Sequence, residues 1–296
     1  MTRAEEKRAA LRRELASDRA TILVGAHDAL TARLIEEHGF DGVWVSGLGV
    51  STMEHALPDM NLITMTEALA TARRIDAATK LPVVADCDNG YGGLSNVVRT
   101  AREYERAGIA GICVEDNTFP KRNSLYTGES TRDLIPTVEQ ARRIRAAKDA
   151  QETPDFVFIA RVEALIAGLG VEEACQRATA YAEAGADAIL IHSRDKTLTE
   201  IQEFLGTWDG LGKVPLVAVP TLYPSYTADE LRDKGFSVVI FANQPMRAAL
   251  RATMETLATL SRHRKADSVD GTIASMDEVF SIVGTKEAIE LEEGRL

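Results

Sequence analysis

The sequence has no long apolar run. Its 296 residues contain no continuous apolar stretch of the ~20 residues that a membrane span requires. The opening segment, MTRAEEKRAALRRELASD, is charged and amphipathic, without the apolar core of a signal peptide. We therefore expect a cytoplasmic protein that has no membrane partner.

Basic residues are also in the minority. Lys and Arg number 34 against 45 Asp and Glu, which gives a net charge of −11 and a pI near 5.1. Nucleic-acid binders and anionic-membrane binders need a basic face, so the composition argues against both classes. A small anionic substrate is still compatible with it, because a few local Arg and Lys side chains can bind one.

Cysteine is scarce, and no CxxC pair is present. Cys87, Cys113 and Cys175 are an odd number at scattered spacings, which favours reduced, buried thiols over a disulfide framework. Small cysteines among apolar residues are usually packing residues. A reactive thiol at Cys87 or Cys113 is the open alternative, because both lie in or beside strands that carry candidate site residues.

Short apolar, β-branched runs alternate with segments of helical period. Continuous apolar runs are typical of strands covered on both faces, hence of parallel sheets. Eight such units fit a closed (β/α)₈ barrel better than an open doubly wound sheet. No GxGxxG follows the first run, which weakens a dinucleotide-binding interpretation. The eight runs are 21–26, 41–47, 82–88, 110–116, 156–164, 188–193, 214–220 and 237–243.

No Pro-, Gly- or Ser-rich linker and no low-complexity tract divides the chain. We expect a single barrel domain over 1–296, with an N-terminal helix at about 3–16 and a C-terminal helical extension at about 244–296. That extension is more helix than a barrel needs and would suit packing between subunits. A homo-oligomer is therefore expected.

Polar residues gather where the predicted strands end, which is where barrel enzymes place their active sites. After the second to fourth runs come the turn Trp44–Leu48, then Asp59, Asp86, Asp88 and the pair Glu115-Asp116. The later runs end in Arg161 and Glu163, His192 and Ser193, Thr221, and Asn243.

The acidic residues among them predict a metal site. Asp59, Asp86, Asp88 and Glu115 follow three adjacent strands, so they should share one patch of the barrel mouth, and they would raise one another's pKa unless a cation compensates. Oxygen ligands without a His or Cys cluster select Mg²⁺, or Mn²⁺, over Zn²⁺. The alternative is that DCDNG is a solvated turn.

Cations and donors follow the facing strands. Arg161 is placed to clamp a carboxylate or phosphate, or else to pair with Glu163 or Glu115. His192 is either a site residue or a hydrogen-bonded structural histidine. The long loop 116–135 carries Lys121, Arg122, Asn123 and Ser124 and is a candidate lid.

The turn Ser46-Gly47-Leu48 offers backbone N–H groups to a substrate oxyanion, since glycine permits close backbone approach. Tight packing at Gly47 is the competing interpretation of the same three residues.

Five motifs together resemble one family. They are SGLGVS at 46–51, DCDNGYG at 86–92, EDNTFPKRNSL at 115–125, PDFVFIARVEALIAGLG at 154–170 and GADAILIHS at 185–193. They are similar, in order, to the family of phosphoenolpyruvate mutase and phosphonopyruvate hydrolase in the isocitrate lyase superfamily. The resemblance runs from about residue 20 to beyond 280. It implies a (β/α)₈ barrel with a Mg²⁺ site, phosphoenolpyruvate or phosphonopyruvate as substrate, and a tetramer built as a dimer of dimers with exchanged helices.

The resemblance also implies roles for individual residues. Asp86 would bind the metal directly, with Asp88 and Glu115 in its water shell. The turn Ser46-Gly47-Leu48 and Arg161 would hold the pyruvyl carboxylate and carbonyl. Asp59 and Lys121 match positions near the transferring group, and Asn123 and His192 would contact the phosphoryl oxygens. Trp44 and Ser124 complete the substrate-binding set.

Within the superfamily, the run KRNSL distinguishes the members. The C–C lyases resemble KRCGH, with an acid–base cysteine that is missing here. The hydrolase resembles a run with threonine where this chain has Asn123, which favours the mutase. In the other direction, the motifs IARVEALIAGLG and AILIHSR resemble the hydrolase at least as closely as they resemble the mutase. Asn117 replaces the family's usual lysine, and Cys87 and Asn89 depart from the usual DADTGYG. These departures leave a different phosphonate or carboxylate substrate as an open alternative.

We therefore expect a mutase that forms the C–P bond of phosphonate biosynthesis. The alternatives are phosphonopyruvate hydrolase, then a 2-oxo- or 2-hydroxy-acid C–C lyase, or a non-catalytic barrel that binds an anion.

Overall fold

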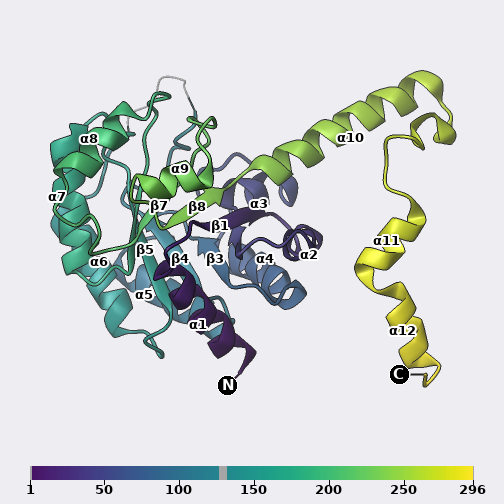
Figure 1. Cartoon of the computed structure of the whole chain (residues 1–296), viewed down its shortest axis with the longest axis horizontal. Helices are drawn as coiled ribbons and strands as arrows, with labels where there is room; N and C mark the ends of the chain where they lie inside the picture. Colours follow the sequence, from purple (N-terminus) through teal and green to yellow (C-terminus); the bar gives the residue numbers. More distant parts are fainter. Residues whose placement is uncertain (1, 127–131, 296) are drawn as a thin grey trace. The chain divides into compact units, whose positions relative to one another are not determined.

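A computed structural model describes residues 2–126 and 132–295 of the chain. Its centre is a closed barrel of eight parallel strands in sequential order (Figure 1). The predicted (β/α)₈ barrel is therefore confirmed, and each strand lies within a predicted apolar run. The strands are β1 (Thr21–Ala26), β2 (Gly42–Val45), β3 (Val83–Asp86), β4 (Gly111–Glu115), β5 (Val157–Val162), β6 (Ala188–Ile191), β7 (Leu216–Ala218) and β8 (Val238–Phe241).

Helices follow the strands on the outside of the barrel. Gly39, Gly108 and Gly185 follow α2, α5 and α7 with positive φ, the left-handed conformation that ends a helix and that glycine adopts without strain. With α1, which precedes the first strand, the helices of this unit are α1 (Arg3–Leu15), α2 (Ala29–Glu37), α3 (Gly47–Met53), α4 (Met65–Ala78), α5 (Leu94–Arg106), α6 (Thr137–Asp149), α7 (Gly170–Glu183), α8 (Thr199–Thr207) and α9 (Ala228–Asp233).

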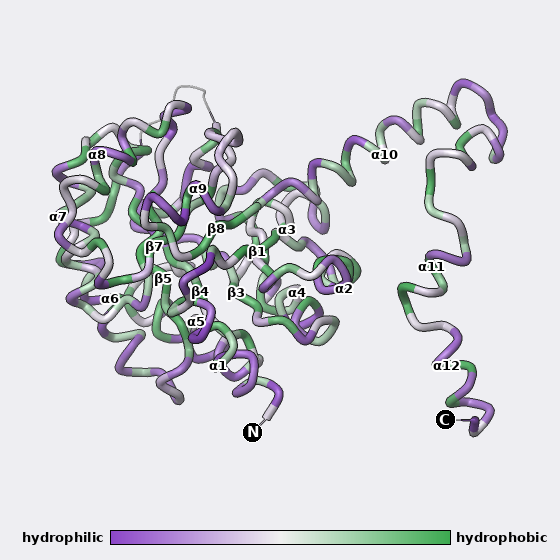
Figure 2. Tube along the Cα trace, in the orientation of Figure 1, coloured by the Kyte–Doolittle hydropathy of each residue, from purple (hydrophilic) through white to green (hydrophobic). Residues whose placement is uncertain are grey.

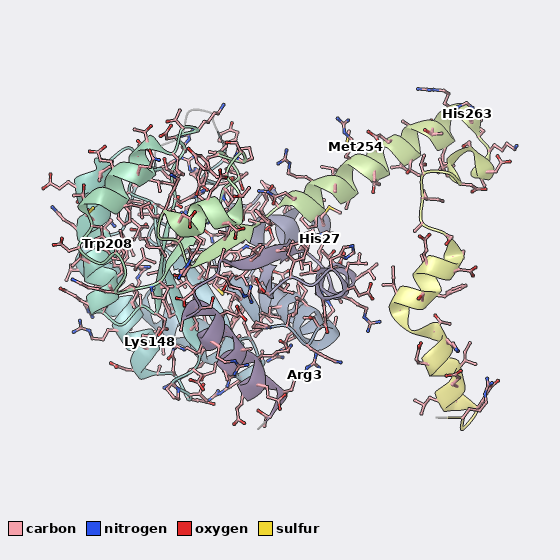
Figure 3. All side chains as sticks on the ribbon, in the orientation of Figure 1. Arg3, His27, Lys148, Trp208, Met254 and His263 are labelled. Atoms are coloured by element: carbon pink, nitrogen blue, oxygen red, sulfur yellow. The ribbon has the colours of Figure 1, made fainter. Side chains whose placement is uncertain are left out.

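Two apolar layers hold this unit together. The larger lies between the strands and the surrounding helices, and the smaller fills the barrel interior. Apolar residues accordingly concentrate on the strands and on the helix faces turned toward them (Figure 2). Polar anchors join neighbouring helices. The indole of Trp208, labelled in Figure 3, donates to Thr179 Oγ1 at 3.0 Å and so ties the end of α8 to α7.

Helix α1 packs against the interior layer. Leu11 and Leu15 belong to the same cluster as the inward side chains of the strands. Arg12 donates to the backbone oxygens of Pro154 and Phe156, at 2.8 and 3.0 Å, and both residues lie just before β5. The N-terminal helix is thus fixed to the barrel at the amino ends of the strands.

The barrel closes where β1 pairs with β8, and this closure depends on Gly25. A Cβ atom at Gly25 would lie 2.0 Å from the carbonyl oxygen of Ala242. Side chains of any size are therefore excluded at this position, because backbone atoms cannot yield as a flexible side chain can.

We predict that Gly25→Ala destabilises the barrel by about 1–3 kcal/mol, the usual cost of overpacking. Gly206→Ala is the matched control, since nothing lies within 4 Å of a Cβ at that position in α8. The control should raise stability by up to about 1 kcal/mol through helix propensity. Urea unfolding of both variants measures the difference, and equal stabilities would show that the strands tolerate the extra methyl.

A second compact unit spans residues 244–296, after the barrel unit of residues 1–243. Its described elements are α10 (Gln244–His263), the 3₁₀ helix η1 (Ala266–Val269), α11 (Met276–Val283) and α12 (Thr285–Glu292). Several of its apolar side chains are exposed, among them Leu257, Phe280 and Met254, which is labelled in Figure 3. Among the described residues, no helix is both long enough and apolar enough to span a bilayer.

Candidate active site

The candidate residues lie on the inward face of the strands because of simple alternation. Trp44, Val84, Cys113, Ile159 and Leu190 fill the barrel interior. Side chains two residues apart along a strand share a face. The next inward positions, at the carboxyl ends, are Ser46, Asp86, Glu115, Arg161 and His192.

These residues surround a cavity of about 60 Å³. All predicted site residues line it except Gly47 and Asp88, which lie directly behind Asp86. Thr221 and Asn243, strand-end residues to which the sequence assigned no role, form part of its wall and are joined by a 3.3 Å hydrogen bond. The structure thus brings the predicted residues of β2 to β6 together.

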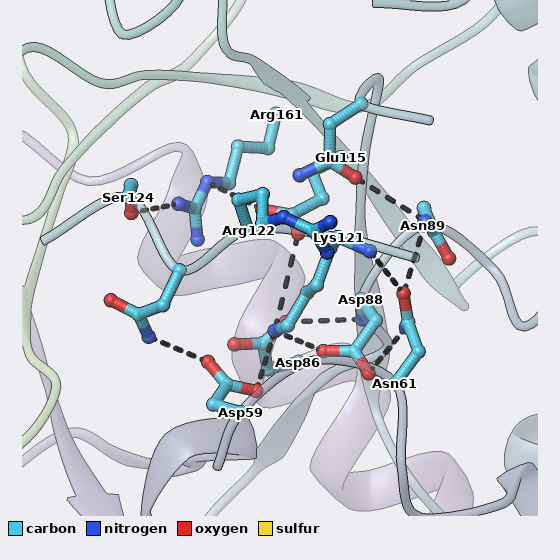
Figure 4. A network of polar contacts seen from close by, with 12 residues as sticks. Asp59, Asn61, Asp86, Asp88, Asn89, Glu115, Lys121, Arg122, Ser124 and Arg161 are labelled. Carbon is cyan, nitrogen blue, oxygen red and sulfur yellow. Dashed lines mark hydrogen bonds and ion pairs between the residues drawn. The ribbon is translucent and has the colours of Figure 1, made fainter. Parts of the chain in front are cut away.

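Lys121 is the counter-ion of the acidic cluster (Figure 4). Its ammonium lies 2.8 Å from Asp59 Oδ1, contacts Asp88 Oδ1 and is 4.0 Å from Glu115 Oε1. Burial opposes the charge of Lys121, but the carboxylates of Asp59 and Asp88 outweigh it and raise its pKa well above the usual value. Lys121 therefore stays protonated, although its side chain is buried.

One ammonium does not balance this cluster. Burial raises the pKa of Asp88 to about 6; Lys121 opposes the shift, and Asp59 adds to it. Burial likewise raises the pKa of Glu115 to about 7, against the opposing effect of Arg161. A further cation would stabilise the ionised form of carboxyl groups whose pKa values are raised this far.

Asp86 is the carboxylate best placed to bind that cation. It lines the cavity, and in the described part of the chain it makes no ion pair; its Oδ1 accepts the Asp88 N–H at 3.2 Å. No group of three or more His, Cys, Asp or Glu side chains among the described residues is arranged to hold a metal directly. The residues fit a cation bound by one carboxylate and several waters, the mode that Mg²⁺ favours.

Gly47 leaves room for this cluster. It opens α3, after Ser46, whose hydroxyl caps the helix by accepting the Gly49 N–H at 3.1 Å. A Cβ at Gly47 would lie 3.2 Å from Asp86 Oδ2 and 3.4 Å from Asp88 Oδ1. Gly47 is therefore needed for the approach of the turn to the two carboxylates.

Arg161 adopts the ion-pair arrangement that the sequence left open and also faces the cavity. Its Nε lies 2.6 Å from Glu163 Oε1 and 3.3 Å from Glu115 Oε2, and its Nη2 donates to Ser124 Oγ at 2.9 Å. Glu163 is buried, yet the charge of Arg161 lowers its pKa to about 2. The guanidinium is thus held by carboxylates on one side and by the loop on the other.

His192 lies beside this pair. Its Nδ1 is 3.0 Å from Arg161 Nη2 and 3.2 Å from Glu163 Oε1. Burial, together with the charge of Arg161, lowers the pKa of His192. The ring is therefore neutral near neutral pH and does not serve as a ready acid.

Asp116, which follows Glu115, has a structural role. It points to the opposite face of the strand, where its carboxylate accepts from the Glu163 N–H at 2.9 Å and from Tyr181 at 2.7 Å. Arg177 pairs with it at 3.0 Å. Alternation alone separates the two neighbouring acids of β4.

The first half of the predicted lid lies over the cavity. Asn123 Nδ2 donates to Asp59 Oδ2 at 2.7 Å, and Asn123 Oδ1 accepts the Leu125 N–H at 3.0 Å. Ser124 is bonded to Arg161, and Arg132 donates to the carbonyl oxygen of Asn123 at 3.0 Å. Residues 127–131 of the predicted lid lie outside the described residues.

The cysteines are free, and two of the three match expectation. Cys87 and Cys113 are buried, and burial raises the pKa of each well above the usual value, which argues against a reactive thiolate. Cys175 was expected to be buried, but this is wrong, because its position on α7 leaves it half-exposed.

Three amides lie behind the acidic cluster; sequence reasoning missed Asn61 and named Asn89 and Asn117 only as departures from the family motifs. Asn61, Asn89 and Asn117 follow β2, β3 and β4, and their side chains are hydrogen-bonded in a row. The signal was present in the sequence, since each lies one to three residues beyond a predicted site carboxylate. Only the loop conformations bring them together.

Three comparisons with known proteins identify the family of the chain. The family model of phosphoenolpyruvate phosphomutase matches residues 11–261. Phosphonopyruvate hydrolase of Variovorax sp. (strain Pal2) is 44% identical over 94% of this chain and 95% of its own. The chain belongs to the phosphoenolpyruvate phosphomutase family.

Solved structures of the family are similar over nearly their whole length. A phosphoenolpyruvate phosphomutase from Streptomyces platensis subsp. rosaceus has a TM-score of 0.92 at 43% identity, covering 97% of this chain and 98% of that one. A phosphonopyruvate hydrolase in complex with oxalate and Mg²⁺ has a TM-score of 0.88 at 41% identity, covering 96% and 98%. The family thus includes both activities at similar distance from this chain.

We predict that Asp86→Ala abolishes Mg²⁺ binding without lowering the melting temperature, because among the described residues Asp86 has no ion pair that the fold would lose. Isothermal calorimetry with Mg²⁺ and oxalate measures the binding. The exposed Asp229→Ala is the control. Unchanged Mg²⁺ affinity in Asp86→Ala would contradict the metal assignment.

Gly47→Ala should weaken Mg²⁺ binding by about 10-fold, comparable to the loss of an outer-shell partner, because its methyl group displaces Asp86 and Asp88. Gly93→Ala, where a Cβ has nothing within 4 Å, is the matched control in the following loop. If both variants bind Mg²⁺ alike, the close approach at Gly47 has no bearing on the metal.

Proposed function

We propose that this protein is a phosphoenolpyruvate mutase, which interconverts phosphoenolpyruvate and phosphonopyruvate with Mg²⁺ (or Mn²⁺) and so forms the C–P bond that begins phosphonate biosynthesis. The observation that carries the proposal is the position of Asn123. Its amide lies over the cavity, oriented by Asp59 and by the Leu125 N–H. A donor fixed in this way can steady a phosphoryl group without reacting with it.

The remaining roles follow from the same arrangement. Asp86 would hold the metal, with Asp88 and Glu115 holding its waters, and bound Mg²⁺ would supply the positive charge that stabilises a pyruvate enolate. The backbone N–H groups of Gly47 and Leu48 at the start of α3, with Arg161, would orient the pyruvyl carboxylate. Ser46 shapes that turn, and Trp44 forms the floor beneath it.

The other end of the substrate meets donors and cations. Asn123, Ser124 and His192 line the cavity and would contact the phosphoryl oxygens. Lys121 neutralises charge beside them. Both oxygens of Asp59 are occupied, by Lys121 at 2.8 Å and by Asn123 at 2.7 Å. Asp59 is therefore better suited to orient those two groups than to attack phosphorus.

The chemistry of the mutase requires no net proton transfer. The bond from phosphorus to the enol oxygen breaks, and its electron pair stays with the pyruvate enolate. C3 of the enolate then supplies the pair for the new C–P bond, so no proton is gained or lost. A loose transfer of this kind needs orientation and charge neutralisation above all.

Phosphonopyruvate hydrolase is the second candidate, favoured by the 44% identity of one such enzyme. That reaction breaks the C–P bond, takes a proton at C3 and consumes a water. The ring of His192 is neutral, and the raised pKa of Lys121 makes its ammonium a weak proton donor. A C–C lyase is less favoured, because Asn123 stands where lyases resemble a cysteine.

We further propose a cytoplasmic homotetramer, a dimer of dimers with exchanged C-terminal helices. The exposed apolar residues of α10 and α11, including Leu257 and Phe280, support burial in an assembly. Light scattering after size exclusion would give the subunit number, and a monomer at micromolar concentration would contradict it.

Phosphorus NMR of the protein with Mg²⁺ and phosphonopyruvate tests the function. We expect the phosphonate resonance to convert to that of phosphoenolpyruvate. Inorganic phosphate with pyruvate as products would instead identify the hydrolase. If phosphonopyruvate persists in the presence of protein that binds Mg²⁺, both assignments fail.

Asn123→Thr tests the residue that carries the proposal. Threonine cannot span from Asp59 to the cavity as the amide does, so the mutase rate should fall by about 100-fold, in the range of losing one fixed donor. The phosphate to phosphoenolpyruvate ratio should rise. Arg122→Ala, in the same loop but outside the substrate cavity, is the control.

A further inference from the structure

Asn61 connects the acidic cluster with the loop that covers it. Its Nδ2 donates to Asp88 Oδ2 at 3.0 Å. Its Oδ1 accepts the backbone N–H of Lys121 at 2.7 Å. One amide therefore bonds both a carboxylate of the predicted metal site and the main chain of the lid, as the close-up shows (Figure 4).

A second amide, that of Asn89, is hydrogen-bonded to the Asn61 side chain. Asn89 Nδ2 lies 3.3 Å from Asn61 Oδ1 and 3.3 Å from Asn117 Oδ1. Asn117 forms an isolated antiparallel bridge with Leu134, at the two ends of the lid loop. The row of three amides thus extends from Asp88 to the base of the lid.

The backbone at Asn61 is also unusual. Its φ is +58°, a left-handed conformation that asparagine and glycine tolerate better than other residues. The conformation turns the amide toward Asp88 and Lys121 at once.

We propose that Asn61 is a positioning residue that docks the lid on the metal-site carboxylate, so that seating of Lys121 and orientation of Asp88 occur together. Lys121 makes the ion pair with Asp88 through its side chain, and Asn61 ties the same two residues through the Lys121 main chain. Two links between the same residues restrict both more than either link would alone.

This inference deepens the proposed function, because the lid and the metal site are parts of it, but its first test needs neither metal nor substrate. Asn61→Gly removes the amide and tolerates the positive φ. Ala56→Gly is the matched control, since Ala56 lies in the same loop, is exposed and has φ +51°.

Limited trypsin digestion of EDTA-treated protein measures lid docking by cleavage after Lys121, Arg122 and Arg132. Loss of one hydrogen bond should raise the open population, and hence the cleavage rate in Asn61→Gly, by about three- to ten-fold. Ala56→Gly should be cleaved at the wild-type rate. Equal rates for wild type and Asn61→Gly would overturn the proposal.

Mg²⁺ affinity, measured by calorimetry with oxalate, tests the Asp88 half. Asn61→Gly should bind Mg²⁺ about three- to ten-fold more weakly, because Asp88 loses a charge-assisted donor. Unchanged affinity alongside faster cleavage would overturn the coupling to Asp88. If the wild type binds no Mg²⁺, the metal part of the proposed function fails, and the cleavage rates still decide lid docking.

Asn89→Ala serves as the second variant should Asn61→Gly unfold. It removes the amide behind Asn61 and should speed cleavage in the same direction by a smaller factor. A wild-type cleavage rate in folded Asn89→Ala would contradict the role of the amide row.

Discussion

The burial of Lys121 among carboxylates is the interaction on which the site depends. Asp59, Asp88 and Glu115 end or follow three adjacent strands, and their charges could not be buried together without a cation. Lys121 comes from the lid, so the same contacts that neutralise the acids also bring the loop over the cavity. The contacts that place the loop over the cavity are therefore the same contacts that balance the charge of the acids. Burial still raises the pKa of Asp88 to about 6 and that of Glu115 to about 7 against the nearby cations, so a divalent ion would stabilise the ionised acids.

A second charged group, centred on Arg161, also borders the cavity. Glu163 and Glu115 hold Arg161, and burial beside that guanidinium keeps His192 neutral. The cavity therefore has an excess of carboxylates on one side, and a paired guanidinium with a neutral imidazole on the other. A small anionic substrate can place its oxygens between a metal on the first side and Arg161 on the second. The pattern suits transfer of a charged group between two atoms of one bound molecule.

The sequence predicts the parts of this site that depend on strand periodicity. Apolar runs located all eight strands, and strand ends located Asp86, Glu115, Arg161 and His192, because inward positions recur every two residues. Periodicity also separates Glu115 from Asp116, a distinction visible once the inward face is known. The contacts of Asn61 could not be predicted in this way. They depend on a left-handed φ and on three loops of irregular conformation, for which no repeat in the sequence exists.

Three departures from the family motifs lie away from the substrate cavity in the structure. Asn89 and Asn117 suggested a changed substrate, but they are bonded to each other at 3.3 Å and neither lines the substrate cavity. Cys87 packs between the barrel and its helices, again away from substrate. Asn89 and Asn117 contact the base of the lid and the amide of Asn61. The two asparagines therefore support the lid from behind the acidic cluster and do not form the wall of the cavity. The departures are therefore compatible with the family's own substrates.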